Sequence, residues 1–306
     1  MTEKNHETKS KFKAIPKQND IFNRKVLQRK RDQAAENFEK HDFLNREITL
    51  RLLDNLQDIK RDFNTILNMN GHFEPISNHF NNKTIFHQDL SLNMLKRSPF
   101  TKIKADEEFL PFLDHSLDLV FSALNLHWVN DLPGALIQIL KSLKPDGLFI
   151  GAALGGETLF ELRSAMMKAG IDALGGTRPH ISPFMDVRDA GSLMQRAGFA
   201  LPVVSTERIT VTYSDAFALM KELKGMAETS CLIKGFKGLT KPSLMMKVAE
   251  HYHADHANND GRIPVTFDIL YFQGWSPHES QQKPLKPGSA KMSLIDALGK
   301  DPLDNQ

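Results

Sequence analysis

The sequence has a single cysteine, and this scarcity excludes several kinds of site. Cys231 has no second cysteine in the chain, so an internal disulfide and a cysteine-based zinc site are both excluded. A lone cysteine is typical of a reducing compartment. No apolar run approaches the roughly 18 residues that cross a membrane. The remaining composition, 41% hydrophobic and 25% charged over 306 residues, excludes collagen-like and fully disordered chains and is typical of a globular protein with a sizeable core.

The chain as a whole also lacks a large excess of charge of one sign, because its formal net charge is +2. Residues 1–31 hold 10 Lys or Arg and 3 Asp or Glu, a net +7, whereas the other 275 residues hold 29 and 34, a net −5. A targeting peptide, a contact with an acidic partner and a solvated tail are three explanations for this basic arm. Glu3 and Glu7 disfavour a mitochondrial presequence, and a secretion-type apolar segment is missing. We predict a disordered basic tail over residues 1–18, with partner contact as the alternative.

Helical patterning begins at Ile21, just after the predicted tail. A second pattern places Ile48, Leu52, Leu56 and Ile59 at intervals of four, four and three residues, which puts all four on one helix face. These patterns predict N-terminal helices that lead into a larger fold.

Four apolar runs in the middle of the chain have the length of β-strands. Helical or turn-rich segments separate them, and strands that alternate with helices predict a parallel sheet covered on both faces. The runs are Thr65 to Met69, Lys83 to His87, Leu117 to Ser122 and Gly147 to Ala152. The predicted fold class is therefore α/β.

The later part of the chain predicts a helix from Val187 to Ala197 that Gly198 terminates, and then two strands, Ile209 to Tyr213 and Val265 to Phe272. The segment between these strands, about 214–262, has helical composition and is placed as an insertion that acts as a lid. We predict one domain over residues 19–300 that includes this insertion.

The strand ends carry the candidate functional residues, because open α/β sheets bind ligands beyond the carboxyl ends of their strands. In chain order they supply a glycine turn, an acid at ribose spacing, an acid on the adenine side and a strand end facing a substrate, which is the order of a nucleoside-binding site. The candidate cofactor-binding residues are Asn68, Asn70, Gly71, Asp89, Asp106 and Glu107. The acceptor-side candidates are Ser122, Asn125, His127 and Trp128, of which His127 and Trp128 fit a packed core equally well.

Several longer stretches resemble the complex I assembly factor five family, which has a class I methyltransferase fold. The resemblance runs from about residue 21 to 298. Its most specific parts are Leu126-His-Trp-Val-Asn-Asp-Leu-Pro133 and His278-Glu-Ser-Gln281. The other matching stretches are Ile21-Phe-Asn-Arg24, Arg29-Lys-Arg-Asp-Gln-Ala-Ala35, His41-Asp-Phe-Leu44, Asp106-Glu-Glu-Phe-Leu-Pro-Phe112, Leu143-Lys-Pro-Asp-Gly147 and Gly155-Gly-Glu-Thr-Leu159.

The resemblance implies a protein that binds S-adenosylmethionine and acts on a protein substrate, a respiratory complex I subunit. It implies the bacterial cytoplasm, or the mitochondrial matrix in a eukaryote, and leaves peripheral membrane contact open. The mitochondrial member hydroxylates an arginine, whereas bacterial members are described as methyltransferases, so both reactions stay open. By position, Asp89 matches the ribose acid, Asp106 the acid beside the adenine, and Ser122 to Trp128 the strand end facing the acceptor.

The turn after the first strand departs from the Gly-x-Gly-x-Gly pattern of the fold. Residues 67–75 keep only Gly71 and place His72, Phe73 and Pro75 where the fold usually has small residues. Either the turn is rebuilt, with Asn70 in a left-handed conformation, or cofactor affinity is weak or lost. The second alternative favours a non-catalytic assembly factor. A third reading is carboxyl methylation of a malonyl thioester, because the family is similar to the malonyl-acyl-carrier-protein methyltransferase of biotin synthesis.

Two other site types find little support. The basic cluster from Arg24 to Arg31 has only Phe22 as an aromatic neighbour, which disfavours a nucleic-acid surface and favours a helix with a solvated basic face. His87-Gln-Asp89 has the spacing of a non-haem iron motif, but Asp89 already fits the ribose position and a third ligand cannot be assigned. We therefore predict no nucleic-acid partner and no metal site.

Overall fold

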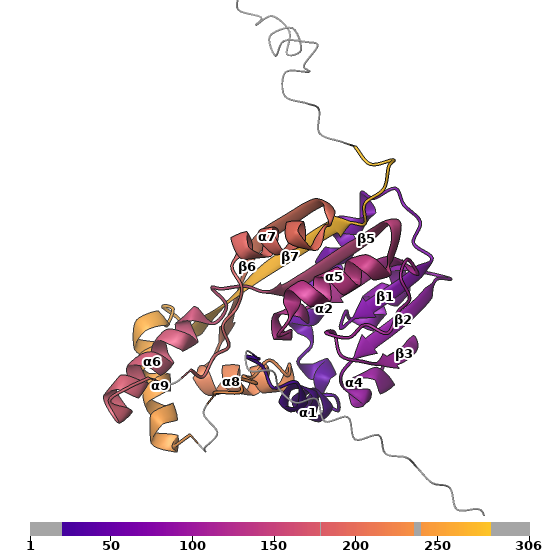
Figure 1. Cartoon of the computed structure of the whole chain (residues 1–306). Helices are drawn as coiled ribbons and strands as arrows, with labels where there is room; N and C mark the ends of the chain where they lie inside the picture. The colour runs from indigo at the N-terminus through magenta and orange to yellow at the C-terminus, as the bar shows by residue number, and fades with distance from the viewer. Residues whose placement is uncertain (1–19, 178, 236–239, 283–306) are drawn as a thin grey trace, which may run out of the picture.

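The computed structural model describes residues 20–177, 179–235 and 240–282, in which seven strands form one sheet (Figure 1). The strand order is β3-β2-β1-β4-β5-β7-β6, and β7 alone runs antiparallel to its neighbours. The strands are β1 (Thr65–Met69), β2 (Thr84–Asp89), β3 (Thr101–Lys104), β4 (Leu117–Ala123), β5 (Leu143–Leu154), β6 (Ala200–Tyr213) and β7 (Ile263–Trp275). This confirms the α/β class. The predicted tail, residues 1–18, and both ends of the predicted domain, 19–300, lie outside the described residues.

Helices cover both faces of the sheet. Helices α2 and α3 pack on one face, and α5 and α7 pack on the other. The main helices are α1 (Arg24–Ala34), α2 (Phe43–Gln57), α3 (Phe73–His79), α4 (Leu92–Lys96), α5 (Leu132–Ser142), α6 (Phe160–Leu174), α7 (Val187–Ala197), α8 (Ala216–Gly225) and α9 (Pro242–His256). Helix α7 has the predicted bounds, and Gly198 ends it with a φ of 95°.

Each face of the sheet builds its own apolar core, because successive residues of a strand point to opposite faces. In β1, Ile66 packs into the core under α2, whereas Leu67 packs into the core under α5. The predicted stripe of α2 is buried at Ile48, Leu52 and Leu56. Ile59 was placed on the same helix, but α2 ends at Gln57 and Ile59 packs on this core from the following loop.

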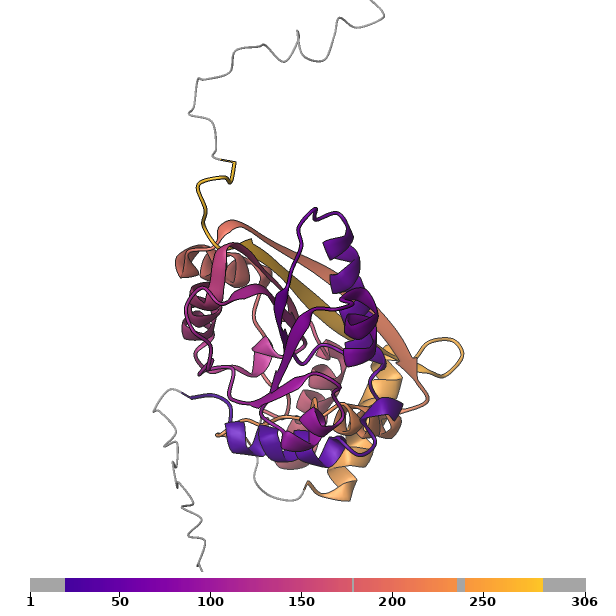
Figure 2. The same cartoon turned by 90° about the vertical axis from the view of Figure 1, so that its right-hand side faces the viewer.

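Helix α1 lies along the edge of the sheet where the strands end, beside α4 and α8 (Figures 1 and 2). The helix begins at Arg24 because the side chain of Asn23 accepts a hydrogen bond from the backbone N–H of Val26 at 3.1 Å. Just before it, Phe22 pairs with Leu232 in an antiparallel bridge. Helix α1 therefore covers the edge of the sheet that the sequence assigns to ligand binding.

The predicted helical insertion is present between β6 and β7 and contains α8 and α9. Helix α9 packs on α6, and the buried Tyr252 of α9 donates a hydrogen bond to the carbonyl of Pro264 at 2.8 Å. Between the two helices the chain returns to α1 through Glu228 to Ile233. None of the helices in the described ranges is long and apolar enough to cross a membrane.

Candidate functional site

The turn after β1 is rebuilt around one glycine and one asparagine. Asn70 has a φ of 66°, which supplies the left-handed residue that a glycine usually provides. Its side chain donates a hydrogen bond to the carbonyl of Ala123 at 3.0 Å and ties the turn to the end of β4. Asn68 binds both backbone groups of Gly71, accepting from its N–H at 2.8 Å and donating to its carbonyl at 2.9 Å. The left-handed conformation expected of Asn70 in a rebuilt turn is therefore confirmed.

Gly71 is required in this turn because a larger residue would not fit. Its backbone conformation does not require glycine, because its φ is not positive. A Cβ atom on Gly71 would lie 2.5 Å from Asn68 Oδ1 and 2.7 Å from both Ile76 and Phe121. We expect Gly71→Ala to lower the free energy of unfolding by about 1–3 kcal/mol, because a well-packed core resists added atoms. Urea denaturation measures this change. Gly175→Ala, at a helix end with open space around it but a φ of 67°, separates backbone strain from overpacking.

The bulky residues after Gly71 fit because α2 makes room for them. The backbone N–H of His72 donates to Thr49 Oγ1 at 2.9 Å, and His72 Nε2 lies 2.8 Å from a carboxylate oxygen of Asp42. The ring of Phe73 stacks on the ring of His72 with centroids 5.1 Å apart. Through these contacts the side chains of His72 and Phe73 support the turn.

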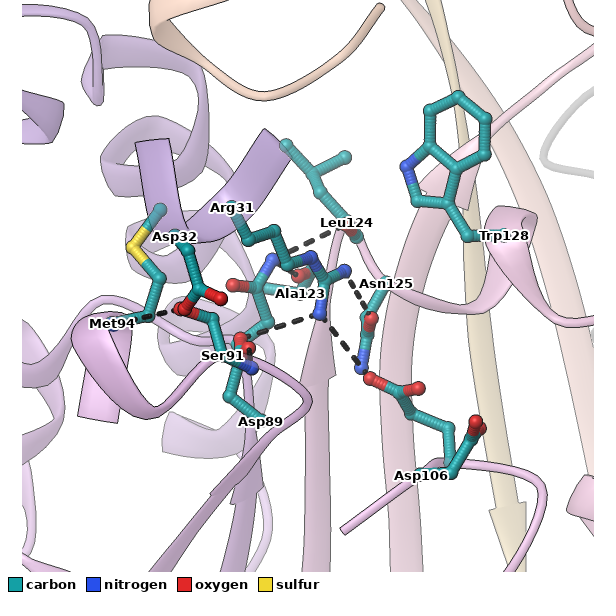
Figure 3. Close-up of polar contacts among 12 residues, drawn as sticks. Arg31, Asp32, Asp89, Ser91, Met94, Asp106, Ala123, Leu124, Asn125 and Trp128 are labelled. Carbon is teal, nitrogen blue, oxygen red and sulfur yellow. Dashed lines mark hydrogen bonds and ion pairs between the residues drawn. The ribbon is translucent and has the colours of Figure 1, made fainter. Parts of the chain in front are cut away.

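Asp89 stands at the last position of β2 and is 1% exposed. One of its oxygens accepts a hydrogen bond from the backbone N–H of Ser91 at 2.6 Å, and the other lies 3.3 Å from Nη1 of Arg31. Ser91 in turn begins α4 by accepting from Met94 N at 3.1 Å and donates to Asp32 at 2.5 Å (Figure 3). Both oxygens of the proposed ribose acid are therefore engaged by the protein itself.

The two acids after β3 are engaged in the same way. Arg31 Nη1 lies 3.3 Å from Glu107 Oε1, and Arg31 Nη2 donates to Asn125 Oδ1 at 2.6 Å. Arg24 lies two helical turns before Arg31 on the same face of α1. Its guanidinium contacts Asp106 at 2.8 Å, and it also contacts the carboxylate of Glu107 and the backbone carbonyl of Trp128. Figure 3 shows the Arg31 guanidinium between Asp89 and Asn125.

The structure thus brings Asp89, Asp106, Glu107 and Asn125 together, but around the two arginines of α1. The sequence predicted a solvated basic face here, and that prediction is wrong for Arg31, which is 4% exposed, and for Arg24, which is largely buried. Lys25 and Arg29 do face solvent. The missed signal is the spacing of Arg24, Leu27 and Arg31, which places both arginines beside a buried leucine on one face.

Little space remains beside these acids. A cavity of about 30 Å3 is lined by the rebuilt turn, His87 and Asp89, whereas cofactor pockets typically enclose roughly 300–1,000 Å3. The residue types therefore suit a nucleoside cofactor, but in this conformation the available volume does not. Burial lowers the pKa of His87 to about 4, so its ring is neutral at pH 7, and Nδ1 finds no hydrogen-bond partner within the described ranges.

Two of the four acceptor-side candidates, His127 and Trp128, contact a carboxylate that the sequence pattern does not single out, whereas Asn125 bonds Arg31. Glu228, between α8 and α9, accepts from Trp128 Nε1 at 3.1 Å and lies 3.0 Å from His127 Nε2. Trp128 also meets the ring of Phe22 edge to face, with centroids 5.4 Å apart. Ser122 is buried, and its hydroxyl lacks a hydrogen-bond partner among the described residues.

A cavity of about 110 Å3 lies next to this group, between α6, the loop 180–184 and the insertion. Its polar lining includes Glu228, Thr229 and Ser230, and its apolar lining includes Trp128 and Leu162. Glu228 lies 100 residues beyond Trp128 in the sequence, so only the folded insertion reveals the pair. Within the described ranges, none of the His, Cys, Asp and Glu groups has an arrangement that could hold a metal ion.

Comparison with known proteins places the chain in a family. A model of the methyltransferase domain matches residues 66–151. Arginine-hydroxylase NDUFAF5, mitochondrial, of Homo sapiens is 43% identical over 295 residues, which cover 93% of this chain and 85% of the human protein. The chain belongs to the arginine-hydroxylase NDUFAF5 family.

More distant matches agree with the fold. A malonyl-[acyl-carrier protein] O-methyltransferase of Gallionella capsiferriformans is 28% identical over 84% of this chain and 92% of its own length. The YcgJ protein from Bacillus subtilis, a solved structure, has a TM-score of 0.52 at 12% identity and covers 75% of this chain and 99% of its own. Arg24, Arg31 and Glu228 all lie outside residues 66–151, the segment that the methyltransferase-domain model matches.

Proposed function

We propose that this chain is an enzyme that modifies an arginine side chain of a respiratory complex I subunit during assembly of that complex. Family membership supports this, because the relatives are named as arginine hydroxylases. The Glu228 cavity is the structural observation that carries it. The relatives are also named as mitochondrial, so we propose the mitochondrial matrix if the source is eukaryotic and the cytoplasm if it is bacterial.

The Glu228 cavity has the chemistry to accept a cationic side chain with an apolar stem. Trp128 Nε1 and His127 Nε2 both contact Oε2 of Glu228 and hold the carboxylate in place. A carboxylate binds a guanidinium through charge-assisted hydrogen bonds, and apolar walls such as Leu162 and Trp128 suit the methylene groups. A malonyl thioester would bring a second carboxylate against Glu228, which disfavours the biotin-synthesis alternative.

The test uses complex I from cells that lack the native gene and carry one variant each. Arginine-containing peptides are compared by mass spectrometry, and assembled complex I is quantified. With the wild-type chain we expect one arginine to gain one oxygen atom, taken from O2 together with two electrons from a cellular reductant, while the second oxygen atom leaves as water; S-adenosylmethionine does not supply this oxygen. A gain of one methyl group would instead show methylation at the same site. Glu228→Gln should lower the modified fraction at least tenfold, because it removes the negative charge but keeps the shape.

Glu250→Gln is the matched control, since Glu250 is an exposed residue of α9 in the same insertion. It should leave the modified fraction unchanged. Restored complex I without any mass change on arginine would contradict the enzyme proposal and support a non-catalytic assembly factor. Rescue of a biotin auxotroph would support the malonyl-thioester alternative.

We propose S-adenosylmethionine as the cofactor, at the edge of the sheet where Asp89, Asp106 and Glu107 lie. The carboxylates at the ends of β2 and β3 are acceptors for ribose hydroxyls and an adenine amino group. Asp89→Asn should weaken binding at least tenfold in calorimetric titrations, because the neutral amide is a poorer hydrogen-bond acceptor for ribose hydroxyls than the carboxylate. Asp118→Asn, a partly exposed acid at the opposite end of the sheet, is the control and should not change affinity.

A further inference from the structure

The proposed cofactor and Arg31 need the same carboxylates. Arg31 binds Asp89 and Glu107 simultaneously, together with the side chain of Asn125, and is nearly fully buried in doing so. The cavity of about 30 Å3 beside them cannot hold a nucleoside. A ligand can therefore reach these acids only after Arg31 leaves.

Helix α1 is held in place by contacts with two different parts of the molecule. On the core side, Asn130 Oδ1 accepts hydrogen bonds from the backbone N–H groups of Ile21, at 2.9 Å, and Phe22, at 2.7 Å. On the insertion side, α1 contacts the segment Glu228–Ile233, which we call the strap. Lys30 Nζ donates to the carbonyls of two strap residues, and the strap carbonyl of Cys231 accepts from the N–H of Asn23 at 2.8 Å.

The charges at the edge of the sheet favour exchange of Arg31 for a cationic ligand. The two arginines of α1 face three carboxylates, Asp89, Asp106 and Glu107, which leaves one negative charge in excess. Removing Arg31 alone would leave two buried carboxylates without this partner, which is costly unless another cation or a set of donors replaces it. S-adenosylmethionine has a net positive charge, and its ribose hydroxyls and adenine amino group are the donors that would face these acids.

We propose that α1 is a plug that the cofactor must displace, and that its displacement releases the strap and opens the Glu228 cavity to the acceptor. Cofactor binding and acceptor access are thereby coupled through one helix. This inference rests on the proposed cofactor but predicts behaviour of the free protein as well.

Cys231 is a built-in reporter of the plug. The thiol is 2% exposed, packs in one cluster with Phe22 and Leu27, and has its pKa raised to about 12 by burial. Because this is the chain's single cysteine, labelling by a maleimide followed by mass spectrometry reports this position alone. With saturating S-adenosylmethionine we expect the wild-type chain to label at least fivefold faster. An unchanged or slower rate at saturation would overturn the plug.

Arg31→Met tests the plug by weakening it without any ligand. The substitution keeps much of the length of the side chain but removes the cation that pairs with the acids. We expect at least tenfold tighter binding of S-adenosylmethionine by calorimetry and faster labelling of Cys231 without any ligand. Arg29→Met, an exposed position on the same helix, is the matched control and should change neither. If Arg31→Met does not fold, the wild-type labelling experiment still decides.

The two proposals fail in distinguishable ways. Binding by the wild-type chain with unchanged Cys231 labelling, or weaker binding by Arg31→Met, overturns the plug and keeps the cofactor. Absence of binding by both chains overturns the cofactor and the plug together. If Arg31→Met gains a site for free arginine but not for S-adenosylmethionine, the acids form a guanidinium site and the plug is overturned.

Discussion

Trp128→Ala is expected to lower the free energy of unfolding by about 3–5 kcal/mol, the range for truncating a large buried aromatic residue. Trp128 is 1% exposed and its ring meets Phe22 edge to face. The substitution also removes the indole N–H that Glu228 accepts, which leaves a nearly buried carboxylate with one hydrogen-bond partner fewer. Trp128→Ala therefore removes packing in the core, the contact with Phe22 just before α1, and the hydrogen bond to Glu228 in the insertion.

Urea denaturation followed by circular dichroism measures the Trp128→Ala effect as a change in midpoint at constant slope. Trp128→Phe keeps an aromatic ring but lacks the N–H donor, so the difference between the two variants separates packing from the hydrogen bond to Glu228. Trp275→Ala is the control for loss of an indole at a half-buried position. Equal losses for Trp128→Ala and Trp275→Ala would contradict a special structural role for Trp128.

Stability is expected to fall by about 3 kcal/mol between pH 6.5 and pH 4 through His87 alone. Burial lowers the pKa of His87 in the folded state from 6.5 to about 4. In this pH window the unfolded chain binds a proton that the folded chain does not, so acid favours unfolding. Above about pH 7.5 both states hold a neutral ring and the effect is nearly absent.

The measurement compares unfolding free energies at pH 7 and pH 4.5 for the wild-type chain and His87→Gln. The variant should lose less stability on acidification, by an amount approaching the predicted figure, because carboxylate titrations are shared by both chains and cancel. His253→Gln, at an exposed position of α9, controls for the loss of an imidazole. An identical acid loss in wild type and His87→Gln would show that the folded protein accommodates a charged His87.

The sequence predicts the fold well where local periodicity carries the information. Short apolar runs locate β1, β2, β4 and the second half of β5, but β3 has no such run and is missed. The strand ends place Asn70 and Asp89 at one edge of the sheet, and Asp106 follows the missed strand at the same edge. The same local rule overextends α2, because Ile59 continues the apolar spacing although the helix has ended at Gln57. Periodicity describes which face is buried, and it does not show where the backbone leaves the helix.

The partners of the site residues could not be predicted in this way. Arg31 pairs with acids 58 and 76 positions away, and Glu228 meets Trp128 across 100 positions. Such pairs depend on how α1 and the insertion dock, which is a property of the assembled sheet. Asn70 is the intermediate case, since its tolerance of the left-handed region was predictable but its bond to the carbonyl of Ala123 was not.

The position of β7 has a consequence for the order of events during synthesis. β7 comes last among the seven strands yet lies inside the sheet, paired on one side with β5 and on the other with β6. Until residues 263–275 have left the ribosome, β5 presents an open edge and the 14 residues of β6 have no neighbour in the sheet. Unpaired strand edges of this kind are prone to aggregation. The sheet of the nascent chain can therefore close only after β7 is made, and truncation before Ile263 removes the strand that joins β5 to β6.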